Sequence, residues 1–82
     1  MSNKEKYVEA FTNSLGIEKD EVVVGLKYQS IPEWDSVGHM ELIAELEDAF
    51  DISMETDDII EFDSYEKGIE LLKKYNVEIE EA

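Results

Sequence analysis

Ser36 is the residue whose type and position in this chain best suit a chemical role. It follows Asp35 and opens a segment, residues 36–50, whose apolar side chains recur at helical spacing. Asp35 is a favoured N-cap residue, so we expect Ser36 at the first helical position, where free backbone N–H groups and the helix dipole favour a phosphate group. Two interpretations stay open at this point: Ser36 carries an attached phosphate-containing group, or it only supports the cap.

Catalytic partners for this serine are scarce. The chain has one histidine, no cysteine and no glycine-rich phosphate-binding loop. His39 lies three positions after Ser36, but its helical phase places it on the core side and no acid is placed to orient it. We therefore interpret His39 as a histidine packed beneath the preceding loop, against Trp34. We expect Ser36 to be an attachment point rather than a nucleophile, and the chain not to be an enzyme.

The composition indicates one small acidic domain. The 82 residues include 22 acids and 7 bases, which gives a net charge of −15. Such a surface repels nucleic acids and anionic lipids and attracts basic protein patches. Hydrophobic residues make up 43% of the chain and recur periodically, which argues against disorder. With no cysteines, no signal peptide and no apolar run of the ~20 residues that span a membrane, we expect a cytoplasmic protein. We also expect it to be a monomer.

The helix signals predict an all-α fold, a four-helix bundle with a long first loop and a short third helix. The pair Ser2 and Glu5 forms a capping box that starts the first helix, and Gly16 can end it. Residues 17–35 then form a loop. We expect its valines and one isoleucine to pin it to the core: Val22, Val23, Val24 and Ile31.

After the helix over residues 36–50, Thr56 can cap a brief helix that includes Ile59, Ile60 and Glu61. Asp63 and Glu66 have the spacing of a capping box for a last helix over about residues 64–75. We expect the domain to cover residues 1–77 and residues 78–82 to form a frayed tail.

The segment over residues 36–50 has two apolar faces. The side chains on the first face are expected in the core: Leu42, Ile43, Leu46 and Phe50. A second strip lies opposite, formed by Val37, Met40 and Ala44, with acids beside it at Glu41, Glu45, Glu47 and Asp48. This strip either packs beneath the long loop or docks a partner that has an apolar groove and a basic rim.

These residues resemble the acyl carrier protein family. The family signature is Asp-Ser-Leu followed by an acidic amphipathic helix, and this chain has Asp35-Ser36-Val37 followed by such a helix. The similarity covers nearly the whole chain. It implies an acyl-carrier-protein-like fold in which Ser36 carries 4′-phosphopantetheine, transferred from coenzyme A by a phosphopantetheinyl transferase. The thiol of this arm would hold an acyl or aminoacyl group as a thioester and shuttle it between enzymes of a biosynthetic pathway.

The resemblance also implies the recognition residues. The acidic ones would be Asp35, Glu41, Glu47 and Asp48, and the apolar ones Val37, Met40 and Ala44. The partners would be the transferase, an acyl- or aminoacyl-activating ligase, synthases and acyltransferases with basic docking patches. The chain departs from the family pattern at Val37, which replaces leucine, and at Gly38, where many fatty-acid carriers have an acid. The second departure favours a dedicated pathway over fatty-acid synthesis.

The cargo stays open among fatty acyl, polyketide, aminoacyl and sugar-modifying acyl groups. The brief third helix is expected to open first, because one or two turns are marginal alone. Apolar residues facing this helix are candidates to line an acyl cleft: Leu46, Phe50, Ile60 and Ile69. An unmodified carrier-like adaptor is the alternative function. A calcium-binding protein is not expected, because residues 48–63 contain no Asp-x-Asx-x-Asx-Gly loop.

Overall fold

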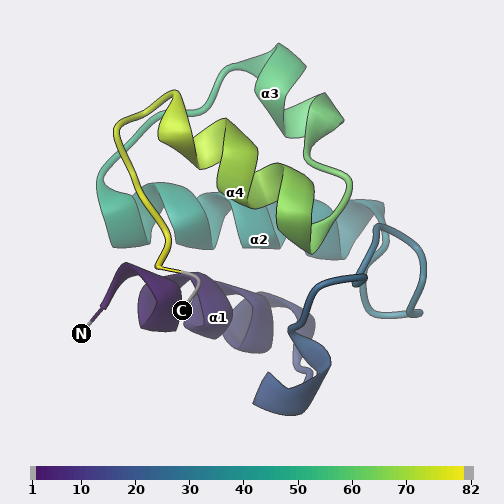
Figure 1. The fold of residues 1–82 in the computed structure, drawn as a ribbon. Helices are drawn as coiled ribbons and strands as arrows, with labels where there is room; N and C mark the ends of the chain where they lie inside the picture. The colour runs from purple at the N-terminus through teal and green to yellow at the C-terminus, as the bar shows by residue number, and fades with distance from the viewer. Residues whose placement is uncertain (1, 81–82) are drawn as a thin grey trace.

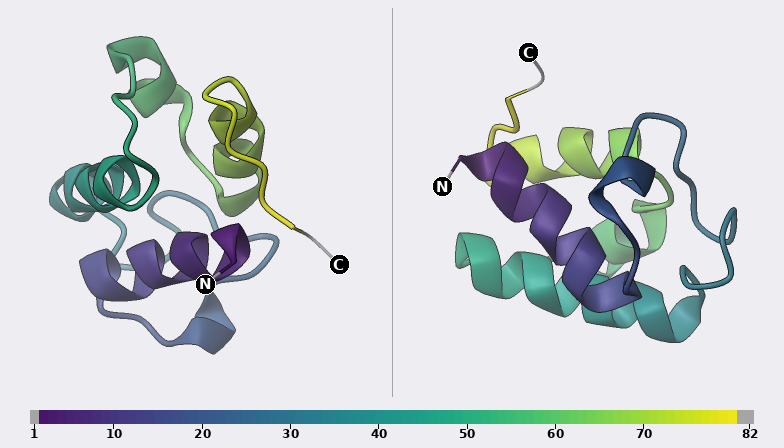
Figure 2. Two further views of the ribbon diagram at one scale, coloured as in Figure 1. Left: turned by 90° about the vertical axis from the view of Figure 1, so that its left-hand side faces the viewer. Right: turned by 90° about the horizontal axis from the view of Figure 1, so that it is seen from below.

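The computed structural model describes residues 2–80, in which all regular elements are helical. They are α1 (Asn3–Leu15), the 3₁₀ helix η1 (Lys19–Glu21), α2 (Ser36–Phe50), α3 (Thr56–Glu61) and α4 (Tyr65–Lys73). The all-α class, the four α-helices and the short third helix are confirmed. Helix α1 packs along α2, and α3 lies on the side of the domain opposite α1 (Figures 1 and 2). Within residues 2–80, no helix combines the length and the apolar character needed to cross a membrane.

The two long helices begin as their sequences predict. In α1, the Ser2 hydroxyl accepts a hydrogen bond from the Glu5 N–H and the Glu5 carboxylate accepts one from the Ser2 N–H, both at 3.1 Å. Gly16 ends this helix in the left-handed conformation, with φ of 69°. In α2, Asp35 is the N-cap and its carboxylate accepts the Gly38 N–H at 2.8 Å. Local signals therefore fix both helix starts.

The starts of α3 and α4 differ from the predictions by one residue. Glu55, not Thr56, is the N-cap of α3, and no side chain caps this helix. Ser64 is the N-cap of α4, and its hydroxyl accepts the Lys67 N–H at 3.0 Å. The predicted capping box of Asp63 and Glu66 is therefore wrong, because the serine beside Asp63 takes the capping position.

An aromatic cluster fills the centre of the domain. Its members are fully or almost fully buried: Tyr7, Phe11, Trp34, Phe62 and Tyr65. The ring centroids of Phe11 and Trp34 lie 5.3 Å apart in an edge-to-face arrangement, one of the two geometries that aromatic pairs prefer. Helix α2 contributes Leu42, Ile43 and Leu46 to the same core, as predicted. Trp34 stands two positions before Ser36, so the core anchors the chain just before this serine.

The long loop is held at fewer points than predicted. Val22 is buried and Ile31 packs partly against the core, but Val23 and Val24 are 51% and 63% exposed, so they do not pin the loop. The loop is tied instead by backbone bonds to the segment between α3 and α4. The Tyr28 N–H donates to the Asp63 carbonyl at 2.8 Å, and the Tyr65 N–H donates to the Leu26 carbonyl at 2.9 Å.

The chain after α4 turns back onto α1. Ile79 is 8% exposed and joins the core, and the Asn3 side chain donates to the Glu78 carbonyl at 2.9 Å. The tail therefore packs against α1 as far as residue 80 instead of fraying from residue 78, because Ile79 gives it apolar area to bury. Residues 81 and 82, also assigned to that tail, lie outside the described residues.

Candidate functional site

Ser36 is the first residue of α2, and its side chain is exposed. Asp35 supplies the cap through its bond to Gly38, and its carbonyl accepts the His39 N–H at 2.8 Å. Within residues 2–80, the Ser36 hydroxyl has no hydrogen-bond partner. The cap is thus complete without the serine, whose hydroxyl lies at the positive end of a 15-residue helix.

Gly38 allows the first turn of α2 to pack closely. A Cβ atom at this position would lie 2.4 Å from the Glu33 carbonyl oxygen and 2.9 Å from a Leu15 methyl carbon. Both distances are shorter than van der Waals contact. Close packing therefore explains why position 38 is a glycine. The absence of an acid at this position then gives no evidence for a dedicated pathway.

A groove of 320 Å³ runs beside the serine, between the start of α2 and α3. Its lining is mostly apolar and consists of Tyr28, Ser36, His39, Met40, Ile59, Ile60, Phe62 and Asp63. Of the residues predicted for an acyl cleft, Ile60 lines this groove and is 72% exposed. Leu46 is fully buried in the core, and Phe50 and Ile69 pack partly against the core without lining the groove.

The second apolar face of α2 is open to solvent. Val37 and Met40 are 67% and 56% exposed, and Ala44 is exposed too. This excludes the alternative in which the strip packs beneath the loop. Of the flanking acids, Asp35, Glu41 and Asp48 are exposed, whereas Glu47 is partly buried and its carboxylate accepts the Met54 N–H at 2.8 Å. Glu47 therefore also supports the linker that follows α2.

His39 packs against Trp34, as predicted, with the two rings stacked at 6.2 Å. The Trp34 indole N–H donates to the His39 Nδ1 at 3.0 Å. Because an indole can only donate, Nδ1 is the acceptor and Nε2 carries the ring proton. Nε2 lies 2.8 Å from the Ile59 carbonyl oxygen in α3 and donates to it. Both ring nitrogens are thus engaged, which leaves neither to take a proton from Ser36.

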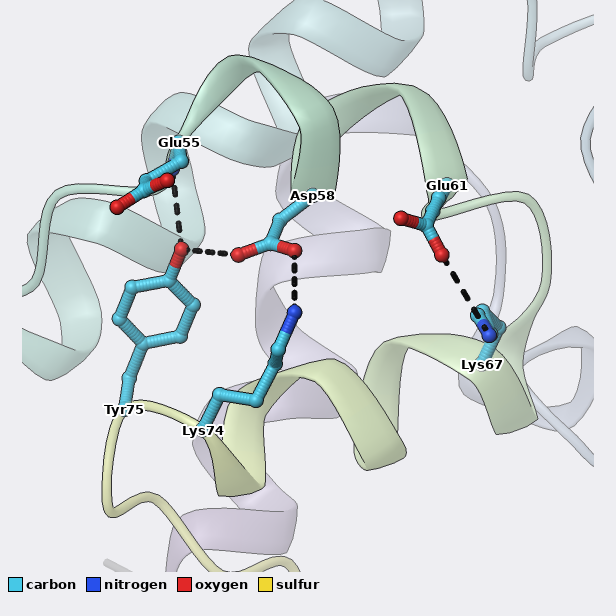
Figure 3. Close-up of polar contacts among 6 residues, drawn as sticks. All are labelled: Glu55, Asp58, Glu61, Lys67, Lys74 and Tyr75. Carbon is cyan, nitrogen blue, oxygen red and sulfur yellow. Dashed lines mark hydrogen bonds and ion pairs between the residues drawn. The ribbon is translucent and has the colours of Figure 1, made fainter.

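A polar network ties α3 to the end of α4 (Figure 3). Asp58 is 6% exposed, and its carboxylate accepts hydrogen bonds from the Lys74 ammonium at 2.8 Å and the Tyr75 hydroxyl at 2.5 Å. The same tyrosine oxygen accepts the Glu55 N–H at 3.0 Å. At the far end of α3, Glu61 lies 3.8 Å from Lys67. We call the contacts of Asp58 with Lys74 and Tyr75 the latch.

The latch shifts the titration of its members. The hydrogen bonds from Lys74 and then from Tyr75 lower the pKa of Asp58, because they stabilise the carboxylate. The bond to Asp58 raises the pKa of Lys74 and, together with burial, the pKa of Tyr75. Sequence reasoning missed the latch, since its members come from segments that carry no local signal of contact. Residues 2–80 hold no group of three or more His, Cys, Asp or Glu side chains arranged for a metal ion.

No protein-family model, curated protein or solved structure matches this chain. The residues and the geometry described above are therefore the basis for a functional assignment.

Proposed function

We propose that this protein is an acyl carrier protein rather than an enzyme. In this proposal Ser36 carries 4′-phosphopantetheine, and the thiol of that arm holds an acyl or aminoacyl group as a thioester. The observation that carries the proposal is the free Ser36 hydroxyl at the start of a capped helix, beside an apolar groove. The resemblance of Asp35-Ser36-Val37 and the acidic helix to the family signature supports it.

The residues around Ser36 suit a phosphodiester. The side chain is exposed, so a transferase can reach it, and the first turn of α2 presents its positive end to the attached phosphate. Asp35 caps the helix independently, so modification of Ser36 breaks no hydrogen bond of the fold. The attached group supplies a thiol that keeps an acyl group activated.

The groove offers a place for the apolar part of the cargo. Met40 on α2 and Ile59 and Ile60 on α3 supply apolar side chains on its two sides, and Phe62 adds an aromatic ring. Burial of an acyl chain there is favourable by about 0.8 kcal/mol for each CH₂ group removed from water. These residues would shield the chain from water while the carrier moves between enzymes.

The open strip of α2 supports docking. Val37, Met40 and Ala44 present apolar contact area, and Glu41 and Asp48 add exposed negative charge. Partners with basic rims would be steered toward this face and released quickly, as a shuttle requires. The proposed partners are a phosphopantetheinyl transferase, an acyl- or aminoacyl-activating ligase, synthases and acyltransferases. We place the carrier in the cytoplasm as a monomer.

Intact-mass spectrometry tests the proposal. The protein is incubated with coenzyme A, Mg²⁺ and a broad-specificity phosphopantetheinyl transferase. We expect wild type to gain one phosphopantetheine and Ser36→Ala to gain none. Ser53→Ala is a matched control, since Ser53 is also exposed but lies in the linker after α2, and it should be modified like wild type. An unmodified wild type would contradict the proposal and favour the adaptor.

A further inference from the structure

His39 joins the chain that precedes Ser36 to the helix that walls the groove. We propose that His39 is a positioning residue that couples the position of α3 to the position of the serine at the start of α2. The inference depends on the proposed function only for its biological meaning, namely that Ser36 is the attachment point. The coupling itself is a property of the unmodified protein.

One imidazole ring makes both connections. On one side its Nδ1 accepts the Trp34 indole N–H at 3.0 Å, and on the other its Nε2–H donates to the Ile59 carbonyl at 2.8 Å. The ring also contacts Tyr28, with centroids 5.4 Å apart, and Phe62, at 5.9 Å. A neutral imidazole has one donor and one acceptor, so both are committed to these two bonds.

Trp34 transmits a change at the ring to the serine. Its side chain is fully buried, and its backbone holds the end of the loop through a bond from the Gln29 N–H at 2.9 Å and a bond to the Ile31 carbonyl at 3.2 Å. Only Asp35 separates it from Ser36. A movement of the indole therefore displaces the cap of α2 and the serine beside it.

Helix α3 is the element able to move. It has six residues and no side-chain cap, so it is marginal without its contacts to the rest of the domain. Consecutive residues tie it to different helices: Asp58 to the latch at the end of α4, and Ile59 to His39 on α2. Because Ile59 and Ile60 line the groove, a molecule that fills the groove displaces α3 and changes the length of the hydrogen bond between His39 and the Ile59 carbonyl. The serine would in this way report whether the groove is occupied.

Two His39 variants separate the two bonds. In His39→Asn, the side-chain oxygen takes the place of Nδ1 and still accepts the Trp34 indole N–H, but no atom reaches Ile59. In His39→Gln, the amide nitrogen takes the place of Nε2 and still donates to Ile59, but the acceptor for Trp34 is lost. If either variant fails to fold, the other still breaks the connection at one known bond.

The indole resonance of Trp34 is the readout, because the chain has a single tryptophan. Tyr75→Phe removes one latch bond and also the acceptor of the Glu55 N–H, and so perturbs α3 from its far side. When His39 is present, we expect Tyr75→Phe to shift the Trp34 indole N–H signal by more than its line width. We also expect it to speed amide hydrogen exchange in α3 about fivefold or more. In the His39→Asn and His39→Gln backgrounds, exchange should still speed up while the indole signal stays unmoved.

Two results would overturn the proposal. The first is an equal shift of the indole signal with and without His39, which would mean that α3 and Trp34 communicate by another route. The second is an unmoved indole signal in the His39 background although α3 exchanges faster. Neither result depends on modification of Ser36, so failure of this proposal is distinct from failure of the carrier assignment.

Discussion

The dipeptide Asp-Ser starts two helices of this domain and does different work at each. At α4, Ser64 is the N-cap, and its hydroxyl is used to accept the Lys67 N–H at 3.0 Å. At α2, Asp35 is the N-cap, and Ser36 becomes the first helical residue with a free hydroxyl. A difference of one residue in helix register therefore decides whether a serine is structural or available for chemistry.

The surroundings of each pair set that register. Ser64 forms an antiparallel bridge with Lys27 of the long loop, which keeps its backbone extended at φ of −160° just before the helix begins. Before α2, the buried Trp34 fixes the chain instead, and Asp35 is the extended residue, at φ of −106°. The dipeptide alone is thus a weak signal, and the contacts of its neighbours supply the rest.

The largest expected effect is that alanine substitution of Ser36 removes modification but not stability, whereas alanine substitution of Ser64 removes stability but not modification. Ser36→Ala should abolish phosphopantetheine addition and change the free energy of unfolding by less than about 0.5 kcal/mol, because no bond is lost. Ser64→Ala should keep the addition and lose about 1 kcal/mol with the cap. Intact mass and chemical denaturation measure the two halves. A destabilised Ser36→Ala, or an unmodified Ser64→Ala that still folds, would erase the distinction.

A glycine in the first turns of each helix sharpens the comparison. In Gly38→Ala the added Cβ atom would meet the Glu33 carbonyl at 2.4 Å. In Gly68→Ala it would meet the buried Phe62 ring at 2.2 Å and the Tyr7 hydroxyl oxygen at 2.3 Å. Each variant should lose about 1–3 kcal/mol of stability. Only Gly38→Ala should also slow modification of the folded protein, because it displaces the loop before Ser36. Equal modification rates would contradict this difference.

The two helices also differ in their expected role in docking. Glu41 on α2 and Glu70 on α4 are both exposed, and so they form a matched pair. Glu41→Lys should lower the association rate with the transferase by up to about tenfold, because it lies beside the apolar strip. Glu70→Lys should have little effect. Stopped-flow binding measures both rates, and equal losses would mean that net charge drives recognition.

The smallest effect concerns pH and the latch at the end of α4. Because the pKa of Asp58 is lowered by folding, its carboxylate stabilises the fold above the ordinary value near 4, and this contribution fades as pH falls through the lowered value. Folding raises the pKa values of Lys74 and Tyr75, so the protonated forms of these two groups stabilise the fold up to about pH 10. This stabilisation is lost as the pH rises through the raised values. The stability difference between wild type and Asp58→Asn should therefore be greatest between about pH 5 and 9. Urea denaturation across this range measures it, and a constant difference would contradict the latch.

Much of the fold could be predicted from the sequence because its signals are local. The capping box of Ser2 and the N-cap Asp35 are each followed by periodic apolar residues, and both long helices start where expected. The exposure of Val37 and Met40 decided between two alternatives that periodicity left open.

The rest depends on contacts between distant segments, which single-sequence patterns do not reveal. Asp58 and Lys74 are 16 positions apart, and His39 and the Ile59 carbonyl 20. The groove likewise combines the loop, α2 and α3, which explains why Ile60 alone among the cleft candidates lines it. The prediction that all three valines after η1 hold the loop was wrong for Val23 and Val24. The apolar character of a side chain does not say whether it faces the core.

Site localisation in the wild-type protein tests the central claim most directly, because both Asp-Ser pairs then compete in one molecule. The protein is incubated with coenzyme A, Mg²⁺ and a broad-specificity phosphopantetheinyl transferase, digested, and analysed by tandem mass spectrometry. We predict one phosphopantetheine on Ser36 and an unmodified Ser64. Modification at Ser64, or at neither serine, would contradict the account.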